Sequence, residues 1–123
     1  MNYKSICRLI RLDYESIPHK GGIVHTYISS QAFRILFWLR LGGGNKIFHL
    51  LSKTILHRLV IGNNSIELGT KIGKGLFLAH PISIVISCKS IIGDYVWIHQ
   101  DVTIGNMYGK GSPIIGNNVL LFA

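Results

Sequence analysis

The feature that most constrains this 123-residue chain is a period of six residues that runs through its second half. An Ile or Leu leads each unit, and a Gly often follows it. The leading residues are Ile66, Ile72, Leu78, Ile86, Ile92, Ile98, Ile104, Ile115 and Leu121. A fixed period of this kind is typical of a solenoid, in which each repeat buries its apolar side only against its neighbours. The many β-branched residues favour strands over helices.

The same period predicts how each coil is built. Three short strands form one triangular coil, with each leading side chain pointing inward and stacking on the same position of the next coil. The residues four places after a lead are also small or apolar, as at Thr70, Val96, Val102 and Val119. An ordinary β-sandwich is the alternative, but it predicts a period of two and a turn signal about every 8–12 residues. We therefore expect a mainly β fold, an incomplete solenoid of about three coils, over residues 61–123.

Residues 1–60 lack this period and predict a helical N-terminal segment. A short helix is expected from Tyr3 to Tyr14. A second is expected over residues 31–41, capped by Ser29 or Ser30 and ended by three consecutive glycines. Asn45 is expected to cap a third helix that runs to about Val60. Apolar residues of this third helix share one face, Phe48, Leu51, Ile55 and Leu59, and basic residues share another, Lys46, His49, Lys53 and His57.

The net charge of +8 belongs almost entirely to this helical segment. Residues 1–60 hold nine Lys or Arg against only Asp13 and Glu15. Such a segment can simply be a solvated face, or it can attract an anionic membrane surface. In the second case we expect aromatic side chains to be exposed beside the basic stripe, namely those of Phe33, Phe37 and Trp38. The chain carries no recognised nucleic-acid motif, so no nucleic-acid partner is expected.

Cysteine usage and the N-terminus indicate the compartment. Cys7 and Cys88 have no metal-ligand spacing and cannot form a disulfide framework. The first residues lack the apolar stretch of a signal peptide, and no run approaches the roughly 20 apolar residues of a membrane span. We expect a cytoplasmic protein without a catalytic metal, with peripheral membrane contact through the basic helices as a possibility.

Four stretches resemble the hexapeptide-repeat acyltransferases. Residues 70–80 resemble the first coil of the serine acetyltransferase group, residues 91–106 its second coil, and residues 109–119 the loop and strand that follow. Residues 31–41 resemble the helix before the repeats in the branch that acetylates surface polysaccharides. The resemblance implies a left-handed parallel β-helix of hexapeptide repeats, a homotrimer, and acetyl-CoA bound between adjacent subunits.

The resemblance also implies the residues of the site. His80 matches the family's catalytic histidine, and neutral imidazole is a base suited to deprotonating an acceptor hydroxyl near neutral pH. Ala79 stands where serine acetyltransferases carry an acid that holds the amino acid, and Ser65 stands where they carry an Asp that orients the histidine. Glu67 is a possible substitute for that Asp.

These departures favour a sugar hydroxyl of a surface polysaccharide or its precursor as the acceptor. Serine O-acetylation is the alternative. The residues expected near acetyl-CoA are Gly105, Asn106, Gly109, Lys110 and Gly111. The glycines allow close approach of the pantetheine arm, and Lys110 offers a point charge for a phosphate.

The resemblance implies further hexapeptides after the last residues of the chain. Leu120, Leu121 and Phe122 would then expose apolar surface where a solenoid needs a cap. A truncated gene product, a fragment, and a short form capped by a partner are the three explanations. A short solenoid of this kind could also be a non-catalytic assembly module.

Overall fold

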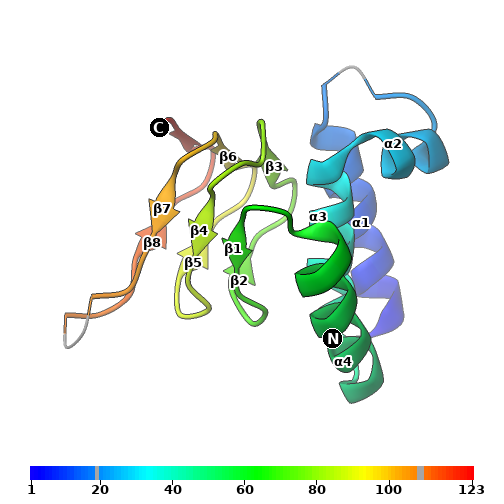
Figure 1. Cartoon of the computed structure of the whole chain (residues 1–123), viewed down its shortest axis with the longest axis horizontal. Coiled ribbons are helices and arrows are strands. Elements are labelled where there is room, and N and C mark those ends of the chain that lie inside the picture. The colour runs from blue at the N-terminus through cyan, green and yellow to red at the C-terminus, as the bar shows by residue number, and fades with distance from the viewer. Residues whose placement is uncertain (19, 108–109) are drawn as a thin grey trace.

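A computed structural model describes residues 1–18, 20–107 and 110–123, apart from the side chains of residues 59 and 60. Helices occupy the N-terminal part, and strands occupy the rest (Figure 1). The helices pack at one end of the strand region, with α1 and α4 on either side of α3 (Figure 1). The helical elements are α1 Tyr3–Ser16, α2 Ile23–Ser29, α3 Gln31–Gly42, α4 Lys46–Ile55 and a π-helical turn, η1, Leu56–Val60.

In the described part of the chain, nine two-residue strands form three parallel sheets, in the orders β1-β4-β7, β2-β5-β8 and β3-β6-β9. Each strand pairs with the third one after it, so the chain passes through all three sheets before it returns to the first. This is a triangular β-helix of three coils, as the period of six predicted. The strands are β1 Ser65–Ile66, β2 Lys71–Ile72, β3 Phe77–Leu78, β4 Val85–Ile86, β5 Ile91–Ile92, β6 Trp97–Ile98, β7 Thr103–Ile104, β8 Ile114–Ile115 and β9 Leu120–Leu121.

The leading residues stack in register, which confirms the interior predicted from the sequence. In the first sheet Ile66 pairs with Ile86 and Ile86 with Ile104, and all three are buried. Leu76 and Val96, each four places after a lead, are fully buried beside them. One continuous hydrophobic core therefore fills the prism and extends into α3.

One corner of the prism shows why glycine follows the lead. A Cβ on Gly93 would lie 2.6 Å from the carbonyl carbon of Gly116 in the next coil, closer than real side chains come. The residues after these glycines link the coils. Asp94 Oδ1 accepts a hydrogen bond from Lys74 N at 3.0 Å, and Asn117 Oδ1 accepts one from Asp94 N at 2.8 Å. The Gly-Asx pairs thus allow the coils to approach closely and satisfy the backbone of the turn.

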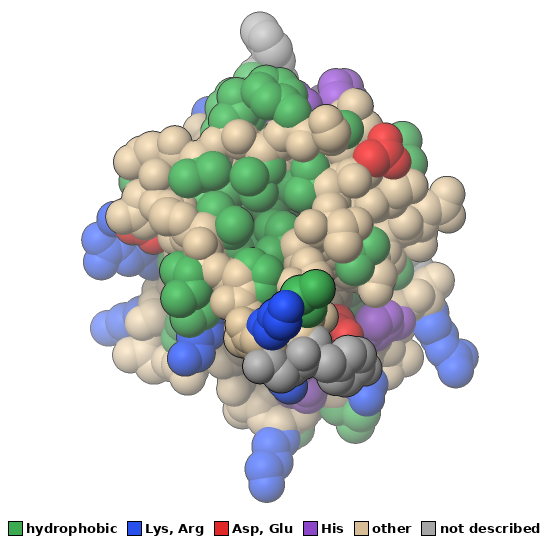
Figure 2. All heavy atoms as spheres, turned by 90° about the vertical axis from the view of Figure 1, so that its left-hand side faces the viewer, with side chains coloured by type: hydrophobic (Ala, Val, Ile, Leu, Met, Phe, Trp, Pro, Cys, Tyr) green, Lys and Arg blue, Asp and Glu red, His purple; other side chains and the backbone are tan. Residues whose placement is uncertain are grey.

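The third coil presents an apolar end face. Figure 2 looks at this end of the prism and shows hydrophobic side chains gathered over it. Leu120 and Phe122 are exposed, as the sequence led us to expect, whereas Leu121 is half-buried together with Ile115 and Val119.

The helix starts follow the predicted caps. The Ser30 side chain accepts a hydrogen bond from Phe33 N at 3.2 Å, and the Asn45 side chain accepts one from Phe48 N at 2.9 Å. Helix α1 reaches Ser16, two residues beyond the predicted end. The third predicted helix is α-helical only to Ile55, and the π-helical turn η1 follows from Leu56.

Two expectations about the helices are wrong. Phe33 is buried between α1 and α3 rather than exposed, and Phe37 and Trp38 are half-buried against neighbouring aromatic rings. The apolar face predicted for the third helix is not buried along its whole length, because Leu51 is exposed. The side chain of Leu59, which was predicted on the same face, lies outside the described part of the structure. Lys46, His49, Lys53 and His57 are exposed as expected.

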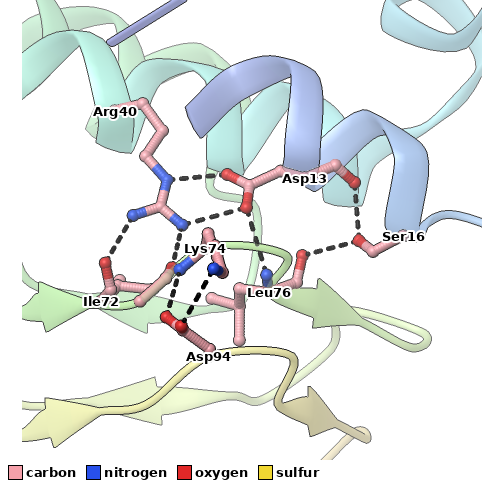
Figure 3. Close-up of polar contacts among 8 residues, drawn as sticks. Asp13, Ser16, Arg40, Ile72, Lys74, Leu76 and Asp94 are labelled. Carbon is pink, nitrogen blue, oxygen red and sulfur yellow. Dashed lines mark hydrogen bonds and ion pairs between the residues drawn. The ribbon is translucent and has the colours of Figure 1, made fainter. Parts of the chain in front are cut away.

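A buried ion pair attaches the helices to the first coil (Figure 3). Arg40 Nε lies 2.7 Å from Asp13 Oδ2, and Arg40 Nη1 donates to Ile72 O at 2.7 Å. Asp13 Oδ1 in turn accepts from Leu76 N at 3.1 Å. Burial raises the pKa of Asp13, while the hydrogen bonds and positive charge of Arg40 act in the opposite direction. The pair therefore links α1, α3 and the turn between β2 and β3.

Candidate active site

His80 occupies the corner between β3 and β4, where the chain departs from its six-residue spacing. Its backbone has φ +52°, in the left-handed region that non-glycine residues seldom adopt, and its side chain is exposed. Ser83 in the same corner has φ +56°. Tyr95, Asp101 and Asn118 adopt the same conformation in other turns of the prism, so it is a feature of these corners and not of His80 alone.

The buried amide of Asn64 holds this corner. Asn64 Nδ2 donates to Pro81 O at 2.7 Å, and Asn64 Oδ1 accepts from Ile84 N at 2.9 Å. One side chain therefore fixes the backbone on both sides of the widened turn that begins at His80. Asn64 has no local signal in the sequence, because its partners are 17 and 20 residues away and meet it only in the folded coil.

A hollow of about 420 Å³ lies beside His80, between the first coil and the helical segment. Ala79, His80 and Pro81 line one side, and the other side is formed by the segment before α2, by α2 itself and by the start of α3. Lys20 and His25 contribute basic groups. No carboxylate side chain lines the hollow among the residues that the structure describes. An acceptor molecule placed here would meet an imidazole and positive charge.

Four other predicted site residues gather in a different place. Ser65, Glu67, Gly105 and Asn106 line a hollow of about 430 Å³ beside β1, β4 and β7. His80 does not line it. The predicted residues therefore fall into two groups: His80 lies before the start of β4, whereas Gly105 and Asn106 lie after the end of β7.

Glu67 is engaged across the coils. Its Oε2 accepts a hydrogen bond from Cys88 N at 2.7 Å, which lowers the pKa of the Glu67 carboxyl. The same carboxylate raises the pKa of the exposed Cys88 thiol. The described part of the chain makes no hydrogen bond to the His80 ring.

The loop after β7 folds back on itself and projects from the prism (Figure 1). Met107 and Gly111 form an antiparallel bridge, and Lys110 N donates to Met107 O at 3.0 Å. Gly111 has φ +93°, a conformation that favours glycine, and Lys110 is exposed. Gly109, which the sequence also placed near acetyl-CoA, lies outside the described residues.

Among the residues that the structure describes, no group of three or more His, Cys, Asp or Glu side chains is arranged so that it could hold a metal ion. None of the described helices combines the length and the apolar character that crossing a bilayer requires.

Comparison with known proteins found relatives that are named serine acetyltransferases. No family model matches the chain. A serine acetyltransferase of Synechococcus elongatus is 38% identical over 130 aligned residues, which cover 98% of this chain and 52% of that protein. A serine acetyltransferase of Staphylococcus aureus is 48% identical over 58 residues, 45% of this chain and 27% of that protein. The chain thus spans about half the length of the first of these relatives, and less of the second.

Solved structures agree on the fold. The serine acetyltransferase of Neisseria gonorrhoeae in complex with serine matches with a TM-score of 0.79 at 20% identity, covering 98% of this chain and 54% of that one. Isoform 3 of the Entamoeba histolytica enzyme, in complex with cysteine, matches with a TM-score of 0.75 at 22% identity, covering 95% of this chain and 45% of that one. The prism is therefore the left-handed β-helix of hexapeptide repeats that the sequence predicted, and the chain is serine acetyltransferase-like.

The comparisons correct the predicted acceptor. Ala79 and Ser65 led us to favour a sugar hydroxyl of a surface polysaccharide, but the relatives found are named serine acetyltransferases. The preference for a sugar was wrong because it relied on two absent carboxylates and one short helix. The similarity that extends along 98% of the chain supports the serine alternative instead.

Proposed function

We propose that this serine acetyltransferase-like chain transfers an acetyl group from acetyl-CoA to the hydroxyl of serine, with His80 as the base. The observation that carries the proposal is the position of His80, exposed in a left-handed corner beside a hollow that could admit a small acceptor. Support comes from the similarity to serine acetyltransferases along 98% of the chain and from the fold shared with the Neisseria gonorrhoeae enzyme in complex with serine.

The reaction needs one proton acceptor and one acceptor hydroxyl. Neutral imidazole takes the hydroxyl proton as the serine oxygen attacks the thioester carbonyl carbon. The tetrahedral intermediate collapses, the carbon–sulfur bond breaks, and the imidazolium returns its proton to the departing CoA sulfur. His80 thus ends the cycle neutral, and the products are O-acetylserine and CoA.

The hollow beside His80 carries basic groups that suit the carboxylate of serine. Lys20 and His25 line it together with His80, and positive charge suits the carboxylate of serine. Asn64 is a positioning residue in this scheme, because it fixes the backbone around Pro81 and Ile84 without lining the hollow.

The donor site requires a second copy of the chain. His80 lies before the start of β4, and the loop with Gly105, Asn106, Lys110 and Gly111 begins after the end of β7. The two therefore lie at opposite ends of the strands of this sheet within one chain. A homotrimer would place the loop of one subunit beside His80 of the next, with acetyl-CoA between them. Lys110 would then reach a phosphate of the donor. We place this protein in the cytoplasm, where acetyl-CoA is available.

The donor site can be tested by calorimetry on the full chain. Micromolar acetyl-CoA binding to wild type and to His80→Ala alike, by a trimer in sedimentation analysis, is the expected result, since His80 acts on the acceptor. His99→Ala is the matched control, because the His99 ring packs on Phe122 at a centroid distance of 4.6 Å, away from the hollow. Stable trimers without any acetyl-CoA binding would refute the proposal in favour of a non-catalytic assembly module.

A further inference from the structure

The outward face of α4 carries an apolar row that the described chain leaves uncovered. Ile47, Leu50 and Leu51 are 69%, 66% and 46% exposed, and their spacing places them on one side of the helix. The opposite side is the one that packs, through the buried side chains of Ser52 and Leu56. Aliphatic side chains of a short helix normally pack against the rest of the protein. An exposed row of them therefore indicates a surface that binds a partner molecule or a membrane.

Basic side chains surround this row. Lys46, Lys53, His57 and Arg58 are all exposed. Lys53, His57 and Arg58 line a shallow hollow of about 520 Å³ together with Leu50, which shows that the basic and apolar groups share one face. The sequence contains no Asp or Glu from residue 16 to residue 66, so no acid of this segment offsets their charge.

We propose that the exposed face formed by α4 and the following turn η1 docks on the surface of an anionic lipid bilayer. Helix α4 supplies Lys46, Ile47, Leu50, Leu51 and Lys53 to this face, and η1 supplies His57 and Arg58. Aliphatic residues of such a helix enter the boundary between headgroups and acyl chains, and basic residues attract anionic lipids. The long stems of Lys46 and Lys53 can follow the apolar row inward while their ammonium groups stay at the headgroups. The docked helix lies on the membrane, since no described helix can span it.

The charge pattern favours a lipid surface over a second copy of this chain. If the α4 faces of two copies packed against each other, lysine side chains would lie beside lysine side chains, and neighbouring like charges are destabilising. The surface also differs from the one expected from the sequence. The aromatic side chains of α3 pack inside the protein, and Phe33 is buried. The aliphatic row of α4 therefore supplies the apolar contact with the bilayer instead.

The test is co-sedimentation of the full chain with vesicles of phosphatidylcholine alone or with added phosphatidylglycerol. We expect binding only to the anionic vesicles, falling steeply from about 0.05 M to about 0.5 M salt. Lys53→Glu should reduce partitioning roughly tenfold or more, because it changes the local charge by two. Leu50→Gln should reduce it about tenfold through lost apolar burial.

Two matched variants serve as controls. Lys71→Glu makes the same charge change on an exposed residue of β2, and Ile28→Gln makes the same polar change on α2, where Ile28 is 71% exposed. Both should bind anionic vesicles within about twofold of wild type. Equal losses in control and α4 variants would overturn the proposal. So would a Leu50→Gln protein that changes its sedimentation state but binds vesicles as wild type does, since α4 would then be an interface between copies.

Discussion

Replacing Arg40 by Met should destabilise the protein more than any other single change at the surface between the helices and the first coil. Met retains an apolar stem of similar length but has no donors. Asp13 is fully buried and would lose both contacts to the guanidinium, at 2.7 and 3.0 Å. The carbonyls of Ile72 and Gly73 would lose their donor as well. Breaking a buried pair by removing one partner typically costs about 3–5 kcal/mol.

The assay is urea unfolding followed by circular dichroism, with the free energy of unfolding taken from the midpoint and slope. A loss of about 3–5 kcal/mol corresponds to a fall in Tm of roughly 12–20 °C for a chain of this size. The double variant Asp13→Asn/Arg40→Met should regain about 1–2 kcal/mol over Arg40→Met, because the uncompensated charge is gone. Arg11→Met, which breaks an exposed pair with Glu15, should cost less than about 0.5 kcal/mol.

The stability that Arg40→Met loses should depend on pH. Without Arg40, the pKa of Asp13 rises further, since burial acts with less opposition. A raised pKa in the folded state favours the folded protein when the carboxyl is protonated, and this advantage disappears as pH rises through the raised pKa. The deficit of Arg40→Met should therefore be largest at neutral pH and shrink on acidification. A deficit below about 1 kcal/mol at neutral pH, or one that grows on acidification, would refute the reasoning.

Three further predictions concern the prism. Ile86→Ala leaves a cavity at a fully buried position of the core and should lower the free energy of unfolding in urea by about 2–5 kcal/mol. A decrease under about 1 kcal/mol would mean that the coils collapse around the cavity. Gly93→Ala should also destabilise the protein, because its Cβ would meet the backbone of the next coil at 2.6 Å, and unchanged unfolding would show that the coils can separate. Glu67→Gln should lower the pKa of the Cys88 thiol and speed its alkylation at mildly alkaline pH, measured by mass spectrometry with Cys7 as the internal reference.

The prism could be predicted from the sequence because its constraint repeats. Ile66, Ile86 and Ile104 occupy the same place in successive coils, so the signal accumulates along the chain. The helices offer no such repetition. Asp13 and Arg40 are 27 residues apart on different helices, and nothing in the local pattern pairs them. Sequence therefore predicted that helices precede the coils but not how they attach to them.

The face of α4 could not be predicted because its sequence permits two apolar faces. Leu51 belongs to a row with Phe48 and Ile55 and also to a row with Ile47 and Leu50. Packing against α3 decides between them, and it buries the side that includes Ser52 and leaves Leu51 exposed. A polar residue on the buried side weakens the periodic signal for that side.

The residues of the candidate site remain a prediction, and the structure adds only where each of them lies. Residue spacing alone would not distinguish His80 from the other histidines, and its prediction came from the resemblance to acyltransferases. The coil geometry then separated Glu67 from it, because the nearest donor to that carboxylate is the backbone of Cys88, 21 residues along the chain. Contacts between coils decide such questions, and they depend on the register of the folded prism.

The central claim, acetyl transfer to serine with His80 as the base, is tested most directly by the serine-dependent release of CoA thiol from acetyl-CoA. The assay compares wild type, His80→Ala and His99→Ala, with O-acetylserine identified by mass spectrometry. We predict serine-dependent release by wild type and His99→Ala, and a rate lower by about 10²–10⁴-fold for His80→Ala. Release by His80→Ala at the wild-type rate, or no O-acetylserine from a wild-type protein that binds acetyl-CoA, would contradict the claim.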